Sequence, residues 1–178
     1  LNSFATRRSS DLVAWDVNDG RVLFDRKIDP SGGAFLEPVA GDQRWIVASL
    51  DGALYAFDAT SGAELYHTGP SGLLSAAPTM VDGRVVLAHI GGGIAWHDPA
   101  TGTVQRAERL PATALGELHA LGTLLAYPAE GNSVQTFDPK DRRTAWTFRT
   151  STTVSRGLRV AEGGQAFLPV REETDRDV

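Results

Sequence analysis

One phrase recurs four times along the 178-residue chain, at intervals of about forty residues. In each copy an aromatic ring stands directly before an aspartate, and in three copies a glycine follows four positions later. The four aspartates are Asp16, Asp58, Asp98 and Asp138. A strand-rich repeat of roughly 40 to 45 residues is typical of a β-propeller, in which each repeat forms one four-stranded blade that packs against its neighbours. The repeat therefore predicts an all-β fold.

Each complete repeat contains four short strand-like runs separated by turns with Asp-Gly or glycine. We expect a two-residue type I′ hairpin turn at Asp51-Gly52. The chain is thus predicted to form a partial β-propeller of four-stranded antiparallel blades over residues 12–170, with half a blade, three blades and half a blade. Because most rings contain more blades, we expect a fragment of a larger ring. The runs of the second repeat are 35–40, 44–50, 53–58 and 63–67.

Both ends of the chain are predicted to lie outside the blades. Residues 6–12 read Thr-Arg-Arg-Ser-Ser-Asp-Leu, the translation of a common sequencing-library adapter, so we interpret residues 1–11 as a non-native or disordered segment. The alternative is a genuine surface loop of the preceding blade. Residues 171–178 are highly charged and are expected to be a solvated tail or the loop to a truncated strand.

The composition excludes several kinds of partner and site. The formal net charge is -5 and no run is rich in Lys and Arg, so no nucleic-acid partner is expected. The chain has no cysteine, which excludes disulfides and thiolate metal sites. No apolar stretch approaches the length of a membrane span, and no signal or anchor is visible.

The repeated aspartates are placed to cap turns. An aspartate at a strand end commonly accepts hydrogen bonds from the backbone of the following turn, and the glycine after it permits a positive φ. One carboxylate per blade at equal spacing indicates a structural role. Eight positions after each aspartate stands a large side chain, which we expect to wedge against the next blade. These residues are Phe24, Tyr66, Arg106 and Trp146.

The repeats resemble those of pyrroloquinoline-quinone-type propellers, whose blades carry the docking motif A-x-D-x-x-x-G-x-x-x-W. The resemblance covers nearly the whole chain after residue 11, including the phrase Asp-Gly-Ala-Leu-Tyr-Ala-Phe-Asp at 51–58. Trp146 supplies the tryptophan of the motif, but its own repeat has Thr136 and Arg142 where alanine and glycine belong.

This resemblance implies two kinds of protein. Quinone-dependent alcohol and glucose dehydrogenases of this type bind the quinone and Ca²⁺ at the ring centre, and the alcohol dehydrogenases cover the quinone with a disulfide of adjacent cysteines. This chain offers no cysteine and no position that matches their catalytic aspartate or metal ligands. Relatives with degraded repeats are non-enzymatic, such as the outer-membrane assembly lipoprotein of bacteria and the sensor domains of bacterial Ser/Thr kinases.

The histidines are expected to have structural or surface roles. A hairpin like that at Asp51-Gly52 would place His89 opposite Ile94 and His97 opposite Val86, so that the two histidines face opposite sides of their sheet. The remaining two, His67 and His119, have no partner at ligand spacing.

Two further features resemble ligand sites but have simpler explanations. The glycines at 91–93 are expected to form a hairpin tip, because a dinucleotide-binding loop is followed by a helix. The acidic residues near the C-terminus lack the glycine-bearing spacing of a calcium loop, and we interpret them as solvated charge. They are Glu172, Glu173, Asp175 and Asp177.

The sequence therefore predicts a non-catalytic binding or scaffold module of a bacterial envelope or extracellular protein. No catalytic, cofactor-binding or metal-binding residue is assigned, and no cofactor is expected. Protein partners would dock on the loop faces of the propeller. One alternative is part of a quinone-dependent dehydrogenase that binds quinone and Ca²⁺ through residues in other blades. Another is the sensor portion of a membrane kinase.

Overall fold

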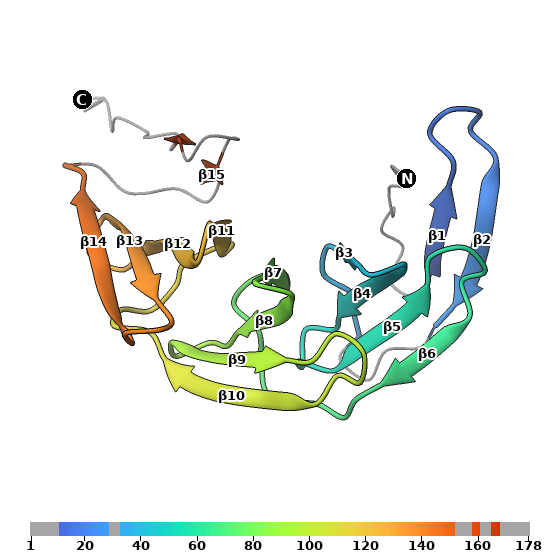
Figure 1. Ribbon diagram of the computed structural model, residues 1–178, viewed down its shortest axis with the longest axis horizontal. Helices are drawn as coiled ribbons and strands as arrows, with labels where there is room; N and C mark the ends of the chain where they lie inside the picture. The colour runs from blue at the N-terminus through green and yellow to red at the C-terminus, as the bar shows by residue number, and fades with distance from the viewer. Residues whose placement is uncertain (1–10, 29–32, 152–157, 161–164, 168–178) are drawn as a thin grey trace, which may run out of the picture.

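The computed structural model describes residues 11–28, 33–151, 158–160 and 165–167. The regular secondary structure of these residues consists of strands, which form five antiparallel sheets. Three sheets have four strands, and the first and last have two. Figure 1 shows the sheets side by side along an open arc. The predicted division into half a blade, three blades and half a blade is confirmed. The predicted terminal segments at 1–11 and 171–178 lie outside the described residues except for Asp11, which begins the first strand and not a separate segment.

The blades are numbered along the chain. Blade 1 comprises β1 (Asp11–Trp15) and β2 (Val22–Lys27). Blade 2 comprises β3 (Val39–Gly41), β4 (Arg44–Ala48), β5 (Leu54–Asp58) and β6 (Glu64–His67). Blade 3 comprises β7 (Thr79–Val81), β8 (Arg84–Ala88), β9 (Gly93–His97) and β10 (Val104–Arg109). Blade 4 comprises β11 (His119–Leu121), β12 (Leu124–Ala129), β13 (Ser133–Asp138) and β14 (Arg143–Arg149). Blade 5 comprises β15 (Arg159–Val160) and β16 (Ala166–Phe167).

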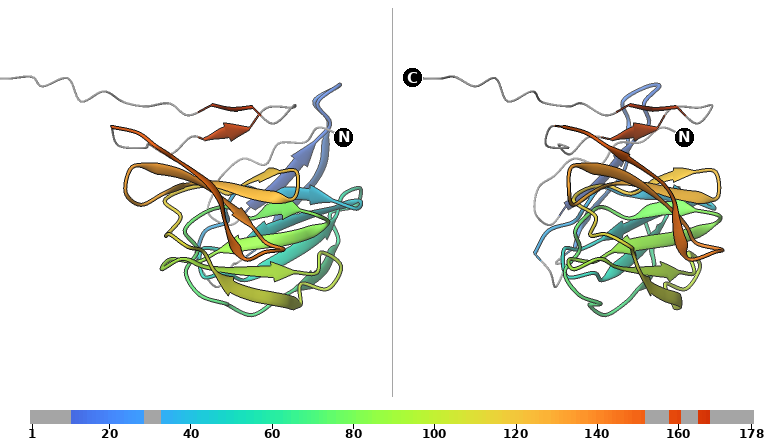
Figure 2. Two further views of the ribbon diagram at one scale, coloured as in Figure 1. Left: turned by 60° about the vertical axis from the view of Figure 1, so that its left-hand side comes forward. Right: turned by 90° about the vertical axis from the view of Figure 1, so that its left-hand side faces the viewer.

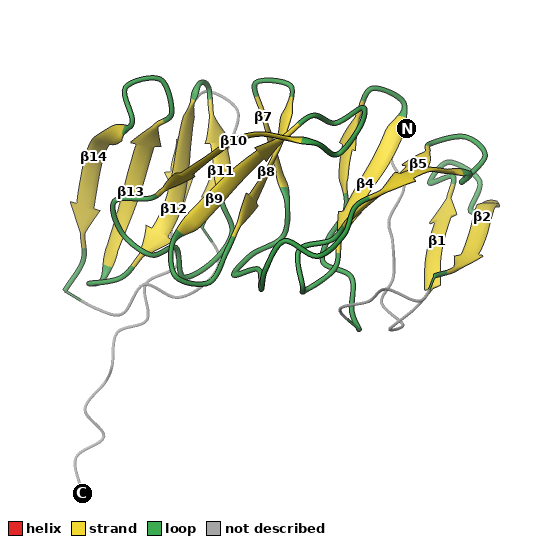
Figure 3. Ribbon diagram, turned by 90° about the horizontal axis from the view of Figure 1, so that it is seen from below, coloured by secondary structure: helices red, strands yellow, loops and turns green. Residues whose placement is uncertain are grey.

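Strands pair in sequence order within each blade, and the blades pack face to face. The first strands β3, β7, β11 and β15 contact one another along the inside of the arc, while β6, β10 and β14 lie at its outer rim (Figure 1). Figure 2 shows the strands of successive blades stacked on one another. The turns between first and second strands and between third and fourth strands lie along one edge of the arc, at the top of Figure 3. We call this edge the turn face.

Apolar side chains fill each interface between neighbouring blades, which we call a seam. Between blades 2 and 3, Leu54 of β5 packs in one cluster with Val85 and Leu87 of β8, and none of these three is exposed. Trp96 of β9 and Tyr127 of β12 belong to the cluster between blades 3 and 4. Sheets covered on both faces in this way have apolar residues on both sides, which is why simple one-sided alternation is absent.

The hairpin between β4 and β5 differs from its prediction. The backbone N–H of Ser49 donates to the carbonyl of Ala53 at 2.9 Å, so three residues, not two, form the turn. Within it Gly52 has a positive φ of 82°, whereas Asp51 does not have a positive φ. The predicted two-residue type I′ turn at Asp51-Gly52 was therefore wrong, because a glycine in the left-handed region closes a longer turn with one extra residue.

The innermost strands are shorter than predicted. Residues 35–40 were expected to form one strand, but the structure has an isolated bridge between Phe35 and Ser49, and β3 begins only at Val39. Pro38 lies in the gap between them and has no N–H for a strand ladder.

A β-bulge interrupts the pairing of the third and fourth strands in blades 1 to 4. In blade 2 the register shifts between Ala56 and Phe57, so that Tyr66 pairs with Ala56 and Glu64 with Phe57. A bulge bends the strand and redirects its side chains. The bulge lies directly before the large residue that stands eight positions after each repeated aspartate. This recurring bulge was not predicted from the sequence.

Candidate binding site

The repeated aspartates cap the turns between third and fourth strands, as predicted. Oδ1 of Asp58 accepts hydrogen bonds from the backbone N–H groups of Thr60 at 3.1 Å and Ser61 at 2.8 Å. The hydrogen bonds from Ser61 are the main reason that the pKa of Asp58 lies below its ordinary value. Backbone N–H groups two or three positions ahead donate in the same way to Asp16, Asp98 and Asp138.

Phe24 and Tyr66, each eight positions after its aspartate, pack on the turn of the next blade, which confirms their predicted wedging role, whereas Trp146 is 41% exposed. A Cβ atom built on Gly62 would lie 2.4 Å from Cγ of Phe24, and one built on Gly102 would lie 2.6 Å from Cε2 of Tyr66. The Tyr66 hydroxyl also donates to the carbonyl of Pro99 at 3.1 Å. Both glycines have positive φ, so their positions need glycine for conformation and for space.

The seam between blades 3 and 4 departs from this pattern at both contacting positions. Arg142 stands in the place of the glycine, with φ of 55°, and Arg106 stands in the place of the aromatic residue. In the turns of blades 2 and 3 a Cβ at this position would clash with the ring. An arginine avoids the clash because its long side chain reaches beyond the Cβ, and Nη2 of Arg106 donates to the carbonyl of Pro139.

A nearly buried carboxylate holds Arg106 in position. Glu108 has a side chain that is 8% exposed, and its Oε2 lies 2.5 Å from Nη2 of Arg106. Its other oxygen accepts a hydrogen bond from Nε1 of Trp96 at 2.8 Å. The guanidinium carbon of Arg106 lies 5.9 Å from the centre of the Trp96 ring, within the range of a cation–π contact. Both Glu108 oxygens are thus satisfied, as a buried carboxylate requires.

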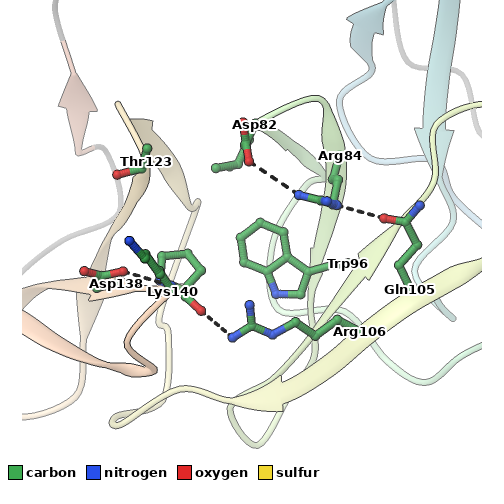
Figure 4. A pocket seen from close by; sticks show the side chains of 10 residues that line it. Asp82, Arg84, Trp96, Gln105, Arg106, Thr123, Asp138 and Lys140 are labelled. Carbon is green, nitrogen blue, oxygen red and sulfur yellow. Dashed lines mark hydrogen bonds and ion pairs between the residues drawn. The ribbon is translucent and has the colours of Figure 1, made fainter.

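A cleft of about 620 Å³ opens beside this network on the turn face, between blades 3 and 4. Its walls come from the β7–β8 turn, from β9 and β10, and from the β11–β12 and β13–β14 turns. Figure 4 shows the indole of Trp96 between the cationic side chains, with carboxylates at the edges. We call it the blade 3–4 cleft. Its charged lining residues are Asp82, Arg84, Arg106, Asp138 and Lys140.

The predicted arrangement of the blade 3 histidines was wrong. His97 pairs with Val85, not Val86, because the β8–β9 turn has one more residue than expected. Alternation along the strand then places His89 on the same side of the sheet as His97. His97 itself is buried, and its Nδ1 lies 3.0 Å from the carbonyl of Gly102. Burial lowers the pKa of His97.

The other histidines lie apart from the cleft. Nδ1 of His67 lies 2.7 Å from Oε1 of Glu64 on the outer strand β6. Nε2 of His119 lies 3.8 Å from Oε2 of Glu117, and burial lowers the pKa of His119. Within the described part of the chain, no group of three or more His, Cys, Asp or Glu side chains could hold a metal ion.

Two other sequence features were the glycines at 91–93 and the acidic residues near the C-terminus. Gly91 and Gly92 lie in the turn between β8 and β9, as predicted, and both have positive φ, whereas Gly93 is the first residue of β9. The four acidic residues near the C-terminus lie outside the described residues. No helix that could cross a membrane occurs in the part of the chain that the structure describes.

Sequence reasoning did not identify the blade 3–4 cleft, although a signal for it was present. Arg106 and Arg142 both depart from the repeat, and they stand at the two positions whose residues touch across the seams between blades 1 and 2 and between blades 2 and 3. A paired departure of this kind indicates that one seam is built differently. Neither Lys140 nor Arg84 carries such a signal, since each is an ordinary surface residue in sequence terms.

Comparisons with known proteins agree with this fold. The family model described as outer membrane protein assembly factor BamB matches residues 8–172. No match was found among curated proteins. Among solved structures, the crystal structure of BamB from Moraxella catarrhalis is similar, with a TM-score of 0.64 and 19% sequence identity over 85% of this chain. The match covers 50% of that chain, so the present chain spans about half its length.

Proposed function

The chain belongs to the family of the outer membrane protein assembly factor BamB, and from this membership we propose that it is a non-catalytic β-propeller scaffold that binds protein partners in the bacterial cell envelope. The assembly role in the family description belongs to that family's named member. We transfer from it the general role of a protein-binding propeller and an envelope or extracellular location.

The observation that carries the proposal is the blade 3–4 cleft on the turn face. Turns can vary without disturbing the blades, and binding residues are therefore common on them. The repeated carboxylates are committed to capping, so they are structural parts of the scaffold. Two charged residues of the cleft, Arg106 and Lys140, depart from the repeat and are not required by the common blade design.

The experiment uses the full-length protein that contains these blades. Crosslinking in intact cells followed by affinity purification should recover a stable partner in the envelope or secreted fraction. The same protein, supplied with pyrroloquinoline quinone, Ca²⁺ and a panel of alcohols and aldoses, should show neither dye reduction nor thermal stabilisation by the two ligands. Quinone-dependent dye reduction without any recovered partner would support a dehydrogenase and contradict the proposal.

A further inference from the structure

We propose that the blade 3–4 cleft binds the carboxylate of an Asp or Glu side chain presented by a partner protein. This inference rests on the proposed function, because it names the chemistry of the partner segment that the scaffold would recognise. It is carried by a comparison of equivalent residues at two seams.

The cleft exists because Arg84 does not bridge the two blades. At the seam between blades 2 and 3, Nη1 of the equivalent residue Arg44 donates across to the carbonyl of Pro99 at 3.0 Å. Arg84 instead stays on its own blade, where Nε donates to Oε1 of Gln105 at 2.8 Å and Nη1 lies 3.4 Å from Oδ2 of Asp82. Its side chain is 46% exposed. A guanidinium that closes one seam therefore forms a wall of the open cleft at the other.

The second donor to the carbonyl across the seam also differs between the two seams. Pro99 accepts hydrogen bonds from both Arg44 and the Tyr66 hydroxyl. Its equivalent, Pro139, accepts from Arg106, which has replaced the aromatic residue. The substitution thus brings a second guanidinium to the seam at the position where a phenol ring would otherwise lie.

The cleft is cationic, although the chain as a whole carries a formal charge of -5. Three cationic and two acidic side chains line it, and Oδ1 of Asp138 already accepts two backbone N–H groups of its turn. Lys140 has no ion-pair partner among the described residues. The equivalent residue in blade 3 is Ala100, so this positive charge is particular to one seam. Lys140 is therefore available to an incoming anion, as is Nη2 of Arg84, which makes no hydrogen bond to the described residues.

The shape and charge of the cleft favour a side-chain carboxylate. Arginine and lysine donate charge-assisted hydrogen bonds to carboxylates. Trp96 closes the inner end of the cleft but is only 3% exposed, and its N–H is committed to Glu108, so the charged side chains supply the contacts to the ligand. The lining has one more cation than carboxylates, which balances a single carboxylate better than a doubly charged phosphate. The opening on the turn face lets a peptide segment reach it.

Binding is tested with a fluorescent peptide of alternating Glu and Ser residues and with its Gln counterpart, by anisotropy at two salt concentrations. The Glu peptide should bind at least about tenfold more tightly, and its affinity should fall as salt rises. Lys140→Ala and Arg84→Gln should each weaken binding by about tenfold, since each removes a charge-assisted contact. The matched control is Arg143→Gln, which removes a charge from the same turn but outside the cleft, and should change the affinity less than about twofold.

Several outcomes would overturn the inference. Equal binding of the Glu and Gln peptides would do so, as would equal losses in the control and the cleft variants while all retain the same melting temperature. Inorganic phosphate that binds the cleft when the Glu peptide does not would assign it to another class of anion.

The partner experiment separates this inference from the proposed function. If full-length protein and the Lys140→Ala/Arg84→Gln variant recover the same partner equally well, the scaffold function stands and the cleft proposal fails. If neither recovers a partner but the Glu peptide still binds in the cleft, the carboxylate site stands and the scaffold function fails.

Discussion

Equivalent positions of the repeat meet at two neighbouring seams, one between blades 2 and 3 and one between blades 3 and 4, but they carry different side chains. At the first, the ring of Tyr66 covers Gly102, and the contact needs no charged partner. At the second, the guanidinium of Arg106 lies against a turn that carries Arg142, and Glu108 balances it. The first contact is filled by a ring, whereas the second leaves a cleft on the turn face.

The two seams show that one substitution in a repeat changes which side chain can stand at the contacting position of the adjacent blade. A side chain at the glycine position takes the space that a ring would fill. The residue that contacts it across the seam must therefore have a long, narrow side chain, as Arg106 has. A long cation then requires a buried anion, and Glu108 supplies it. Such a polar contact adds less net stability than apolar packing, but removing one member of it is costly. The two seams should therefore respond differently to substitution.

The largest effect is expected from Gly102→Ala. A Cβ there would lie 2.6 Å from atoms of both Tyr66 and Thr68 at a backbone φ of 71°, so the free energy of unfolding should fall by roughly 2–4 kcal/mol. The control is Gly83→Ala, which has a similar φ of 70° but open space around the new methyl group, and should cost about 1 kcal/mol. Urea denaturation measures both, and equal losses would show that ring packing on the glycine is unimportant.

A smaller effect is expected at the polar seam from Glu108→Gln. The substitution keeps an acceptor for the Trp96 indole but removes the charge beside Arg106, so the free energy of unfolding should fall by about 1–3 kcal/mol. Glu64→Gln is the matched control, because Glu64 pairs with His67 on the exposed strand β6 and should cost less than about 0.5 kcal/mol. Similar losses in the two variants would mean that the Glu108 network adds no stability to the seam.

The blades could be predicted from the sequence because the phrase that marks the turn between third and fourth strands occurs four times. Asp58 and its counterparts mark the same turn in each copy, and Phe24 and Tyr66 fill the predicted docking positions. The register of the β4–β5 and β8–β9 hairpins could not be predicted in the same way. One extra turn residue moves every pair by one position, and the phrase Asp51-Gly52 is compatible with turns of two or three residues.

The cleft could not be predicted because it depends on where side chains reach in space. Arg44 and Arg84 are the same residue at equivalent positions of the repeat. One crosses its seam to a proline carbonyl, whereas the other stays on its own blade beside Gln105, and the guanidinium of Arg106 lies at the proline carbonyl opposite. Only the departures at Arg106 and Arg142 were visible beforehand.

The two positions of the polar seam should be energetically coupled. Arg106→Tyr alone should be destabilising, because the ring meets Arg142 and Glu108 loses its closest cation, whereas Arg142→Gly alone should have little effect. The double variant restores a ring on a glycine and should recover about 1 kcal/mol relative to the sum of the single changes. A double-mutant cycle measured by urea denaturation tests this, and strict additivity would show that the two positions do not act together.

The smallest effect concerns His97, whose ring lies at the position held by Phe57 and Phe137 in neighbouring repeats. Its Nδ1 donates to the carbonyl of Gly102, and its buried Nε2 has no partner among the described residues, so a second proton would have no acceptor there. Burial lowers the pKa of His97 below the ordinary 6.5. The unfolded chain therefore takes up a proton first, and this contribution to stability is present above pH 6.5 and falls as the pH drops through the folded pKa.

His97→Phe should accordingly reduce the loss of stability between about pH 6.5 and 5, measured as urea midpoints across that range. Part of the dependence should remain, since burial also lowers the pKa of His119. His67→Phe is the control, because that ring lies on the exposed strand β6 and is not enclosed by a seam. An unchanged pH dependence in His97→Phe would mean that protonation of this ring does not oppose the packing of blade 3 on blade 2. A changed pH dependence would show that a titrating group lies inside a seam, at a position that holds phenylalanine or tryptophan in the other repeats.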